Sequence, residues 1–417
     1  MKIEYEAWHE EPNYSEVPEK TALFFGANTP LKHISEAGCP PYEERPQQEE
    51  MARRTAEAFA LSKNLCVEAP TGVGKSFAYL VPSIFYALAS KKPVIISTET
   101  INLQEQLVKK DIPTLQKIMG VEFKAALAKG RSNYLCKRRL AVAMGKNAGD
   151  YLPIDSFGAS ISRIAKWAEN TEDGSRMSID FPVNWNVWEY VCSEIGNCLR
   201  NKCSHFRECF YWKARKSWDT ADIIIANHAL FFIDLKMKTL DKLENSILPL
   251  PSGIVIDEAH KLEDEAASHL GLHLNSYGVK AFLKKLFDPE RAKGLLMIGG
   301  ERTILLRGTV ADTITAVDFF FESVRNFLVE KNKSEYRIKN PFFVEDTITT
   351  QLTKLEKELG EYIETLSDDN FAQELVAQQS ACESYAKGFW DFINMSISES
   401  VYWIEGKRND KSVIQMN

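Results

Sequence analysis

The chain has 417 residues, of which 44% are hydrophobic and 26% charged, and its formal net charge is −7. This length allows two or three domains with separate cores, and the composition is ordinary for a globular protein. No stretch reaches the roughly 18–20 apolar residues that a membrane-spanning helix needs, and the opening MKIEYEAWHEEP lacks the apolar core of a signal peptide. We therefore expect a cytoplasmic protein without membrane association, in which the eight cysteines are reduced.

Short apolar runs alternate with longer amphipathic stretches from residue 64 onward. A helix containing Pro82 is predicted for SFAYLVPSIFYALA (76–89). Buried strands that end in polar residues are predicted for LCVEAP (65–70), VIISTE (94–99), IIIAN (223–227) and IVIDEAH (254–260). This alternation predicts an α/β fold with a parallel sheet, which gathers its ligands at the carboxyl ends of the strands.

A phosphate-binding loop is predicted for EAPTGVGKS (68–76), between a predicted strand and a predicted helix. The full signature is G-x-x-x-x-G-K-[ST], and Ala69 stands at its first glycine. Gly72 and Gly74 let backbone N–H groups converge on phosphate oxygens, Lys75 reaches the β- and γ-phosphates, and Ser76 can bind Mg²⁺. The residues predicted to bind ATP here are Ala69, Pro70, Thr71, Gly72, Val73, Gly74, Lys75 and Ser76.

An acidic pair in IVIDEAH supplies the second half of a predicted ATPase site. Asp257 would hold Mg²⁺, and Glu258 would position or deprotonate the attacking water. Two such elements, each following a predicted buried strand, are hard to explain as chance. We assign hydrolysis to Lys75, Asp257, Glu258 and His260.

Three cysteines lie close together in NCLRNKCSHFREC, with four and then five residues between them: Cys198, Cys203 and Cys209. Structural zinc usually takes two C-x2–4-C knuckles, and the second gap is too wide for one. Iron–sulfur clusters also take cysteine thiolates. The spacing alone leaves zinc and a cluster open.

Basic and aromatic residues accompany these cysteines. Between Cys198 and Trp218 there are six basic residues and one acidic residue, Glu208, among five aromatic side chains. The segment KGRSNYLCKRR (129–139) carries five basic residues and no acidic one. This composition is typical of a groove for single-stranded nucleic acid, and equally of a solvated face over a few core aromatics.

Taken together, these motifs resemble the XPD/DinG-type iron–sulfur helicases of superfamily 2, most closely the bacterial DinG branch. RPQQEEMA (45–52) is similar to their adenine-sensing Q motif, which points to Gln48 and Arg45 as ATP-binding residues. ISTETINLQEQLVKKDIP (96–113) is similar to their motif Ia, which touches the DNA backbone. AKGRSNYLC (128–136), the cysteine triplet and ADIIIANHALFF (221–232) follow in the family's order, so the resemblance covers about 45–265.

The resemblance implies a RecA-like motor domain (1–130 and 218–265), an inserted iron–sulfur domain (131–217) and a mostly helical arch (266–417). It implies that one [4Fe-4S] cluster is bound by Cys136, Cys198, Cys203 and Cys209. It places the residues that contact single-stranded DNA at Thr100, Gln106, Arg131, Tyr134, Lys137 and Arg138. We interpret the remaining thiols as small buried side chains: Cys39, Cys66, Cys192 and Cys382.

Two family motifs are missing from this sequence. No Ser-Ala-Thr tripeptide follows the predicted arch, and Gly130–Arg131, the single Gly-Arg pair, precedes the cysteine triplet. We therefore expect the second motor domain to be absent and to come from a partner protein or a longer chain.

By resemblance, the chain belongs to an ATP-dependent DNA helicase that moves 5′→3′ on single-stranded DNA, in DNA repair, with ATP, Mg²⁺ and a [4Fe-4S] cluster as cofactors. One alternative is an iron–sulfur module that binds ATP and single-stranded DNA without unwinding. Another is a zinc-stabilised ATPase with a protein partner.

Overall fold

The structure is a computed structural model that describes residues 14–33, 43–99, 101–145, 152, 156–240, 246–406 and 414–416. The chain divides into two compact units. The first consists of Met1–Lys129 and Ala214–Leu270, and the second of Gly130–Lys213 and Gly271–Asn417. The second unit therefore joins the two regions, 131–217 and 266–417, that the resemblance treats as separate domains. Among the described residues, no helix combines the length and apolar character needed to cross a membrane.

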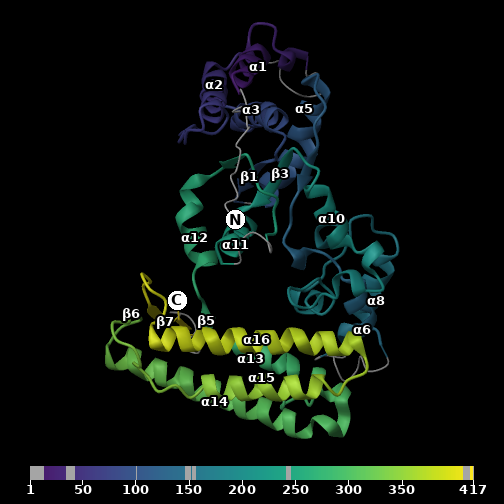
Figure 1. Cartoon of the computed structure of the whole chain (residues 1–417), viewed down its shortest axis with the longest axis vertical. Coiled ribbons are helices and arrows are strands. Elements are labelled where there is room, and N and C mark those ends of the chain that lie inside the picture. Colours follow the sequence, from purple (N-terminus) through teal and green to yellow (C-terminus); the bar gives the residue numbers. More distant parts are fainter. Residues whose placement is uncertain are drawn as a thin grey trace, which may run out of the picture. The chain divides into compact units, whose positions relative to one another are not determined.

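A four-stranded parallel sheet forms the centre of the first unit (Figure 1). Its order is β2-β3-β1-β4, with bounds Ala125–Leu127, Ile223–Asn227, Val94–Thr98 and Gly253–Ile256. All of β1 and most of β3 are buried, which suits their nearly continuous β-branched sequences VIIST and IIIAN. The predicted α/β class with a parallel sheet is confirmed.

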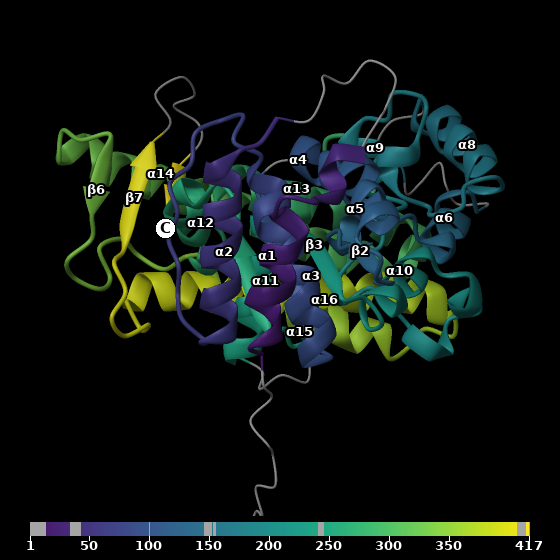
Figure 2. The same ribbon diagram turned by 90° about the horizontal axis from the view of Figure 1, so that it is seen from above.

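Helices of the first unit pack on this sheet and on one another. In α3 the side chains from Ala78 to Ala87 are buried, and Pro82 lies inside the helix as predicted. Figure 2 shows α3 beside α1 and α2, and these three helices pack together. The helices have the bounds α1 Glu16–Phe25, η1 Pro30–His33, α2 Pro46–Ala60, α3 Lys75–Ser90, α4 Ile101–Gln106, η2 Leu107–Asp111 (a π-helical turn), α5 Ile112–Ile118, α11 His228–Leu240, η7 Ala259–Lys261 and α12 Leu262–Leu270.

One predicted strand of the first unit is wrong. Residues 65–70 form no strand, and the side chains of Leu65 and Val67 are exposed. Ile254 in the edge strand β4 is also exposed, although β4 is as apolar in sequence as β1. A cavity of about 890 Å³ is lined by both segments, 63–69 and 254–260. Residues 65–69 thus border this cavity together with β4 and are not paired with it.

The cysteine-bearing part of the second unit is built from short elements. Its helices have the bounds η3 Arg131–Asn133, α6 Lys137–Ala143, α8 Ser156–Ala168, η4 Arg176–Ser178, α9 Trp185–Trp188, η5 Arg200–Lys202 and η6 Phe206–Glu208. The helix α10 (Phe210–Trp218) crosses the boundary between the two units. Trp188, fully buried, donates its indole N–H to the Ser132 carbonyl at 2.7 Å, which ties α9 to η3.

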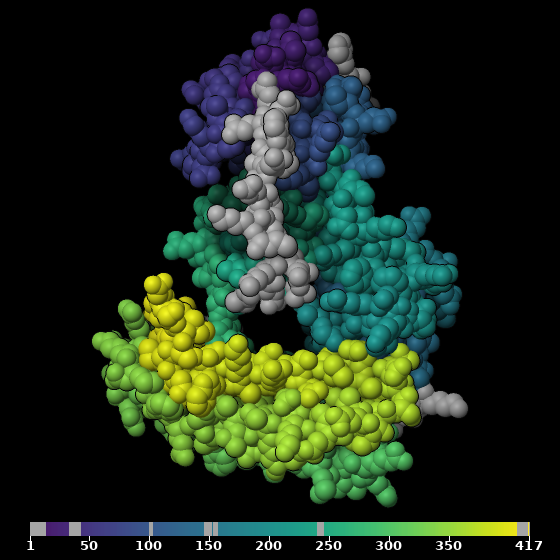
Figure 3. Space-filling model, in the orientation of Figure 1, coloured from purple at the N-terminus to yellow at the C-terminus, as the bar shows by residue number. Residues whose placement is uncertain are grey.

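Long helices dominate the rest of the second unit: α13 Ser276–Leu286, η8 Leu295–Thr303, α14 Ile304–Glu330, α15 Thr349–Ile363 and α16 Asp369–Asn394. In α15 the side chains of Leu352, Leu355 and Leu359 are buried. In Figure 3, α15 and α16 form one continuous band of yellow and yellow-green atoms. This unit also contains a small antiparallel sheet, which was not expected from the sequence. Its order is β5-β8-β7-β6, with bounds Leu274–Asn275, Ile414–Met416, Trp403–Gly406 and Glu335–Arg337.

Candidate nucleotide site and cysteine region

The predicted phosphate loop is a turn that leads directly into α3. Gly72 and Gly74 both have a φ of +88°, in the region that glycine adopts without strain. Gly74 is the N-terminal cap of α3, so Lys75 and Ser76 lie in the first turn of that helix. A helix N-terminus directs backbone N–H groups and partial positive charge outward, which suits an anionic phosphate.

Gln48 supports this loop from α2. Its side-chain Nε2 donates a hydrogen bond to the Gly74 carbonyl at 2.7 Å, and the residue is 4% exposed. A Cβ atom added to Gly74 would lie 2.1 Å from Gln48 Nε2, so the contact requires glycine there. Arg45 is exposed and lies beside the same position. The structure thus brings both predicted ATP-binding residues of the 45–52 segment next to the phosphate loop.

The acidic pair lies at the carboxyl end of β4. Lys75 Nζ is 3.5 Å from Glu258 Oε1, and the two side chains are 29% and 30% exposed. Glu258 has a left-handed backbone with φ +55°. Such a conformation is uncommon for a residue other than glycine and is often found at functional sites. The structure therefore brings together Lys75 and the acidic pair, which are 183 positions apart in the sequence.

Tyr79 joins this group, although the sequence analysis did not select it. Its hydroxyl donates to Asp257 Oδ2 at 3.2 Å. Burial, together with the charge of Asp257, raises the pKa of Tyr79 well above its ordinary value, so the phenol remains a donor. Tyr79 follows Lys75 by four positions on α3, and that helical spacing is the signal that could have found it.

Burial raises the pKa of Asp257, and the hydrogen bond from Tyr79 partly opposes this effect. The hydroxyl of Ser76 hydrogen-bonds with Tyr79 and Asp111. His260 is largely exposed, and its Nδ1 lies 3.4 Å from Glu258 Oε2. Lys75, Ser76, Asp257 and Glu258 are thus connected through direct contacts or through Tyr79.

His228 is a second residue that the sequence analysis left without a role. It follows β3 and is buried, and its Nδ1 lies 2.7 Å from the hydroxyl of Ser97 on β1. The Asp257 backbone N–H in turn donates to the Ser97 carbonyl at 2.9 Å. Burial lowers the pKa of His228, which favours the neutral imidazole. These contacts join the ends of three neighbouring strands beneath the acidic pair.

The four candidate ligand cysteines come from separate turns of the second unit. Cys136 caps the N-terminus of α6, and its backbone N–H donates to the Val191 carbonyl at 2.8 Å. Cys203 ends η5, and Cys209 ends η6 and directly precedes α10. All four side chains, including Cys198, are of intermediate exposure. Cys192 and Cys382 are buried, as predicted for structural thiols. Cys66 is exposed, contrary to that prediction, and Cys39 lies outside the described residues.

Electrostatic interactions link Cys209 to the other three thiols of this set. Burial raises the pKa of Cys136 and of Cys209. Burial alone would also raise that of Cys198, but the backbone N–H of Arg200 and the charge of Arg131 bring its pKa below the ordinary value. Within the described ranges, no group of three or more His, Cys, Asp or Glu side chains is arranged to hold a metal ion.

The surroundings of these thiols nevertheless suit an iron–sulfur cluster in their chemistry. Backbone N–H groups act to lower the pKa of three of these thiols: that of Arg139 for Cys136, that of Arg200 for Cys198, and those of Tyr211 and Trp212 for Cys209. Hydrogen bonds to sulfur are one of the means by which proteins tune such clusters. The indole nitrogen of Trp212 is buried and has no hydrogen-bond partner among the described residues.

The predicted DNA contacts divide by exposure. Arg131 lies over the Tyr211 ring, with its guanidinium carbon 4.1 Å from the ring centroid, and Lys137 Nζ lies 2.6 Å from Glu208 Oε2. Gln106 is exposed in α4. Tyr134 and Arg138 are buried, at 4% and 3% exposed. Thr100 lies outside the described residues.

Comparisons with known proteins agree with this site. The DEAD/DEAH box helicase family matches residues 45–146, and the DEAD_2 family matches residues 193–278. The ATP-dependent DNA helicase YoaA of Escherichia coli is 33% identical over 302 residues, which is 72% of this chain and 44% of the relative. The ATP-dependent helicase DinG of Mycobacterium tuberculosis strain H37Rv is 35% identical over 261 residues, 58% of this chain and 38% of the relative. By these matches, the chain is similar in sequence to DEAD/DEAH box helicases and to the helicases YoaA and DinG.

The chain spans less than half the length of these relatives. Among solved structures, a truncated XPD aligns over 80% of this chain and 82% of its own, with a TM-score of 0.38 and 15% sequence identity. The two family matches contain the phosphate loop, the acidic pair and all four candidate ligand cysteines.

Proposed function

We propose that this chain supplies an ATP-hydrolysing motor domain, with an inserted iron–sulfur region, to an ATP-dependent DNA helicase acting on single-stranded DNA. The observation that carries the proposal is the group around Lys75. The first turn of α3 presents a lysine to the two carboxylates that follow β4, and Tyr79 holds one of them. The family matches over 45–146 and 193–278 support the same activity.

Each residue of the group has a distinct role in the proposed hydrolysis. The backbone of 71–76 and Lys75 bind the phosphates of ATP, and Glu258 positions and deprotonates the attacking water. Asp257 and Ser76 would hold Mg²⁺, which when bound neutralises phosphate charge. Tyr79 orients the Asp257 carboxylate through its hydrogen bond. His260 contacts Glu258 and orients it.

We propose that Cys136, Cys198, Cys203 and Cys209 hold a [4Fe-4S] cluster. Four cysteine thiolates are its usual ligands, and the backbone N–H groups that act to lower the pKa of three of these thiols favour the thiolate form. When bound, the cluster would covalently join turns that are otherwise held by short contacts. Zinc is the competing ligand.

For DNA we propose contacts from Gln106, Arg131 and Lys137, together with Thr100. Tyr134 and Arg138 are buried, so we propose that they support the cysteine region instead of touching DNA. From the resemblance of its motifs, we propose that the complete protein acts in the cytoplasm, moves 5′→3′ and serves DNA repair. A partner or a longer chain would supply the second motor domain.

The test is the binding of a fluorescent single-stranded oligonucleotide, measured by anisotropy over a range of salt concentrations. We expect the affinity to fall steeply with salt, because phosphate neutralisation releases counterions. We expect Arg131→Ala to weaken binding and to reduce the salt slope by about 1. Salt-insensitive binding, or none, would contradict the proposal. Unwinding of a forked duplex in the same samples separates a complete helicase from an ATP- and DNA-binding module.

A further inference from the structure

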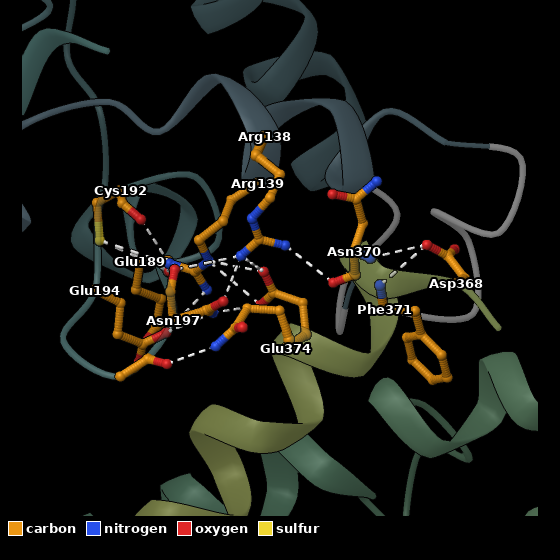
Figure 4. Close-up of polar contacts among 12 residues, drawn as sticks. Arg138, Arg139, Glu189, Cys192, Glu194, Asn197, Asp368, Asn370, Phe371 and Glu374 are labelled. Carbon is orange, nitrogen blue, oxygen red and sulfur yellow. Dashed lines mark hydrogen bonds and ion pairs between the residues drawn. The ribbon is translucent and has the colours of Figure 1, made fainter. Parts of the chain in front are cut away.

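A single buried carboxylate connects the cysteine region with the helical part of the second unit. Glu374 lies in the second turn of α16 and is 0% exposed (Figure 4). Its two oxygens accept hydrogen bonds from Arg138, Arg139 and Asn197. Two of these residues directly follow the Cys136–Lys137 pair, and the third directly precedes Cys198. Glu374 lies at least 177 positions from each of these residues in the sequence.

The Arg138 guanidinium holds three chain segments together. Its Nη2 donates to Glu374 Oε1 at 2.8 Å and to the side-chain and backbone oxygens of Asn197. Its Nη1 donates to the Asn370 carbonyl in the first turn of α16 at 2.9 Å. The start of that helix is fixed separately by Asp368, whose side chain accepts from the Asn370 backbone N–H at 2.9 Å.

The Arg139 guanidinium extends the same network towards the turn that precedes Cys198. Its Nε lies 3.3 Å from both oxygens of Glu374. Its Nη1 donates to the carbonyls of Glu189 and Cys192 at 2.8 and 2.7 Å. Its Nη2 lies 3.4 Å from Glu194 Oε2.

Asn197 closes the arrangement from the other cysteine segment. Its Nδ2 donates to Glu374 Oε2 at 2.8 Å and to Glu194 Oε2 at 3.1 Å. Beside it, Gln373 of α16 donates to the Gly196 carbonyl at 2.7 Å. The residues that follow Cys136 and the residues that precede Cys198 are therefore both held by the start of α16.

Burial makes this network depend on its carboxylate. Arg138, Arg139 and Asn197 are at most 3% exposed, so water cannot replace Glu374 as an acceptor. Removing one partner from a buried ion pair leaves an uncompensated charge, which the surrounding segments relieve by moving. The segments free to move here are the ones that carry Cys136 and Cys198.

We propose that Glu374 is a positioning residue for the iron–sulfur ligands: from α16 it fixes the segments of Cys136 and Cys198 relative to each other. Outer contacts of this kind orient metal ligands, and losing them commonly weakens metal binding by about 10–100-fold. This inference rests on the proposed function, because it takes the four cysteines to be cluster ligands. It makes α16 part of the cluster-binding unit.

The experiment compares anaerobically purified wild-type chain with Glu374→Gln, which keeps the side-chain shape and removes the charge. Iron release to a chelator is followed through the cluster's absorption. We expect Glu374→Gln to lose iron at least roughly tenfold faster than wild type. Hydrogen exchange should rise in 134–140 and 193–199 of the variant, and should stay unchanged in α14.

Two control variants separate positioning from general stability. Leu375→Ala opens a cavity at the adjacent buried position of α16 and leaves the network in place. Glu356→Gln removes a carboxylate from α15 that accepts a 2.8 Å hydrogen bond from Gln379. We expect both variants to release iron at close to the wild-type rate. If Glu374→Gln does not fold, Asn197→Ala, which keeps both arginine pairs, should release iron faster than wild type.

The outcomes are distinguishable. If wild type binds iron and Glu374→Gln releases it at the same rate as wild type, the role of Glu374 is overturned but the cluster is not. The role of Glu374 is also overturned if Leu375→Ala releases iron as fast as Glu374→Gln does. A wild-type chain without iron and sulfide would overturn the proposed cluster itself.

Discussion

The nucleotide site and the cysteine region are stabilised in different ways. Around Lys75 the contacts join the ends of regular elements: the first turns of α3, the end of β4 and one side chain from α2. Around Cys136 and Cys198 the chain runs in short turns, and a glutamate from a distant helix holds them. The sheet positions the first site, and a buried polar network positions the second.

This difference affects how each region responds to substitution. A site at the ends of buried strands keeps its backbone when one functional side chain changes, because β1 and β3 lie in the core. In the cysteine region the segments of Cys136 and Cys198 share one buried carboxylate, so the loss of that charge partner displaces their backbone. Substitutions in the first region should therefore change chemistry, and substitutions in the second should change metal retention.

The largest expected effect is that of Glu258→Gln on ATP hydrolysis. Loss of a general base typically lowers turnover by about 10²–10⁴-fold. Because β4 and its neighbours are unaffected, ATP binding and the cluster's absorption should be retained. A phosphate-release assay and a nucleotide titration on the same sample measure both. Glu263→Gln, an exposed carboxylate in the first turn of α12, is the control and should leave turnover unchanged.

A smaller effect is expected for Gln48→Ala. The lost hydrogen bond to the Gly74 carbonyl contributes about 1 kcal/mol, or roughly fivefold in nucleotide affinity. Since the contact supports the loop backbone, affinity for ATP and for GTP should fall by similar factors in a fluorescence titration. A loss for ATP alone would instead support adenine recognition by Gln48. Gln47→Ala, at the exposed neighbouring position, should bind both nucleotides as wild type does.

A difference in thiol reactivity is also expected, without effect on either proposed site. Cys66 is exposed in the segment 65–70 of the first unit, whereas burial raises the pKa of Cys192 to about 11. The thiolate is the reactive form, so brief treatment with iodoacetamide at about pH 8 should label Cys66 at least roughly tenfold faster than Cys192. Peptide mass spectrometry measures the two rates. Equal rates would mean that the turn around Cys192 is open to solvent.

The nucleotide site could largely be predicted from the sequence, because its residues lie in short motifs next to buried strands. Tyr79 could have been added from helical spacing, but His228 could not, since its contact with Ser97 depends on the order of strands in the sheet. The strand predicted at 65–70 failed because pairing is not local: the segment is apolar, yet β4 does not pair with it.

The sequence was less informative about the cysteine region. Its residues identify candidate ligands, but a cluster of basic side chains does not show which of them are buried. Arg138 looks like a DNA contact in the sequence and is paired with Glu374 in the structure. The helical spacing places Glu374 on the buried face of α16, three residues after Phe371. It does not reveal the partners of Glu374, which lie at least 177 positions away in the sequence.

The most direct test of this account is ATP turnover by the purified 417-residue chain, with and without single-stranded DNA, beside Lys75→Ala. The account predicts measurable turnover that Lys75→Ala abolishes, with the cluster's absorption unchanged in the variant. Stimulation by DNA would extend this result to coupling between the two units. Failure of the wild-type chain to bind or hydrolyse ATP, or equal turnover by Lys75→Ala, would contradict the assignment of the nucleotide site.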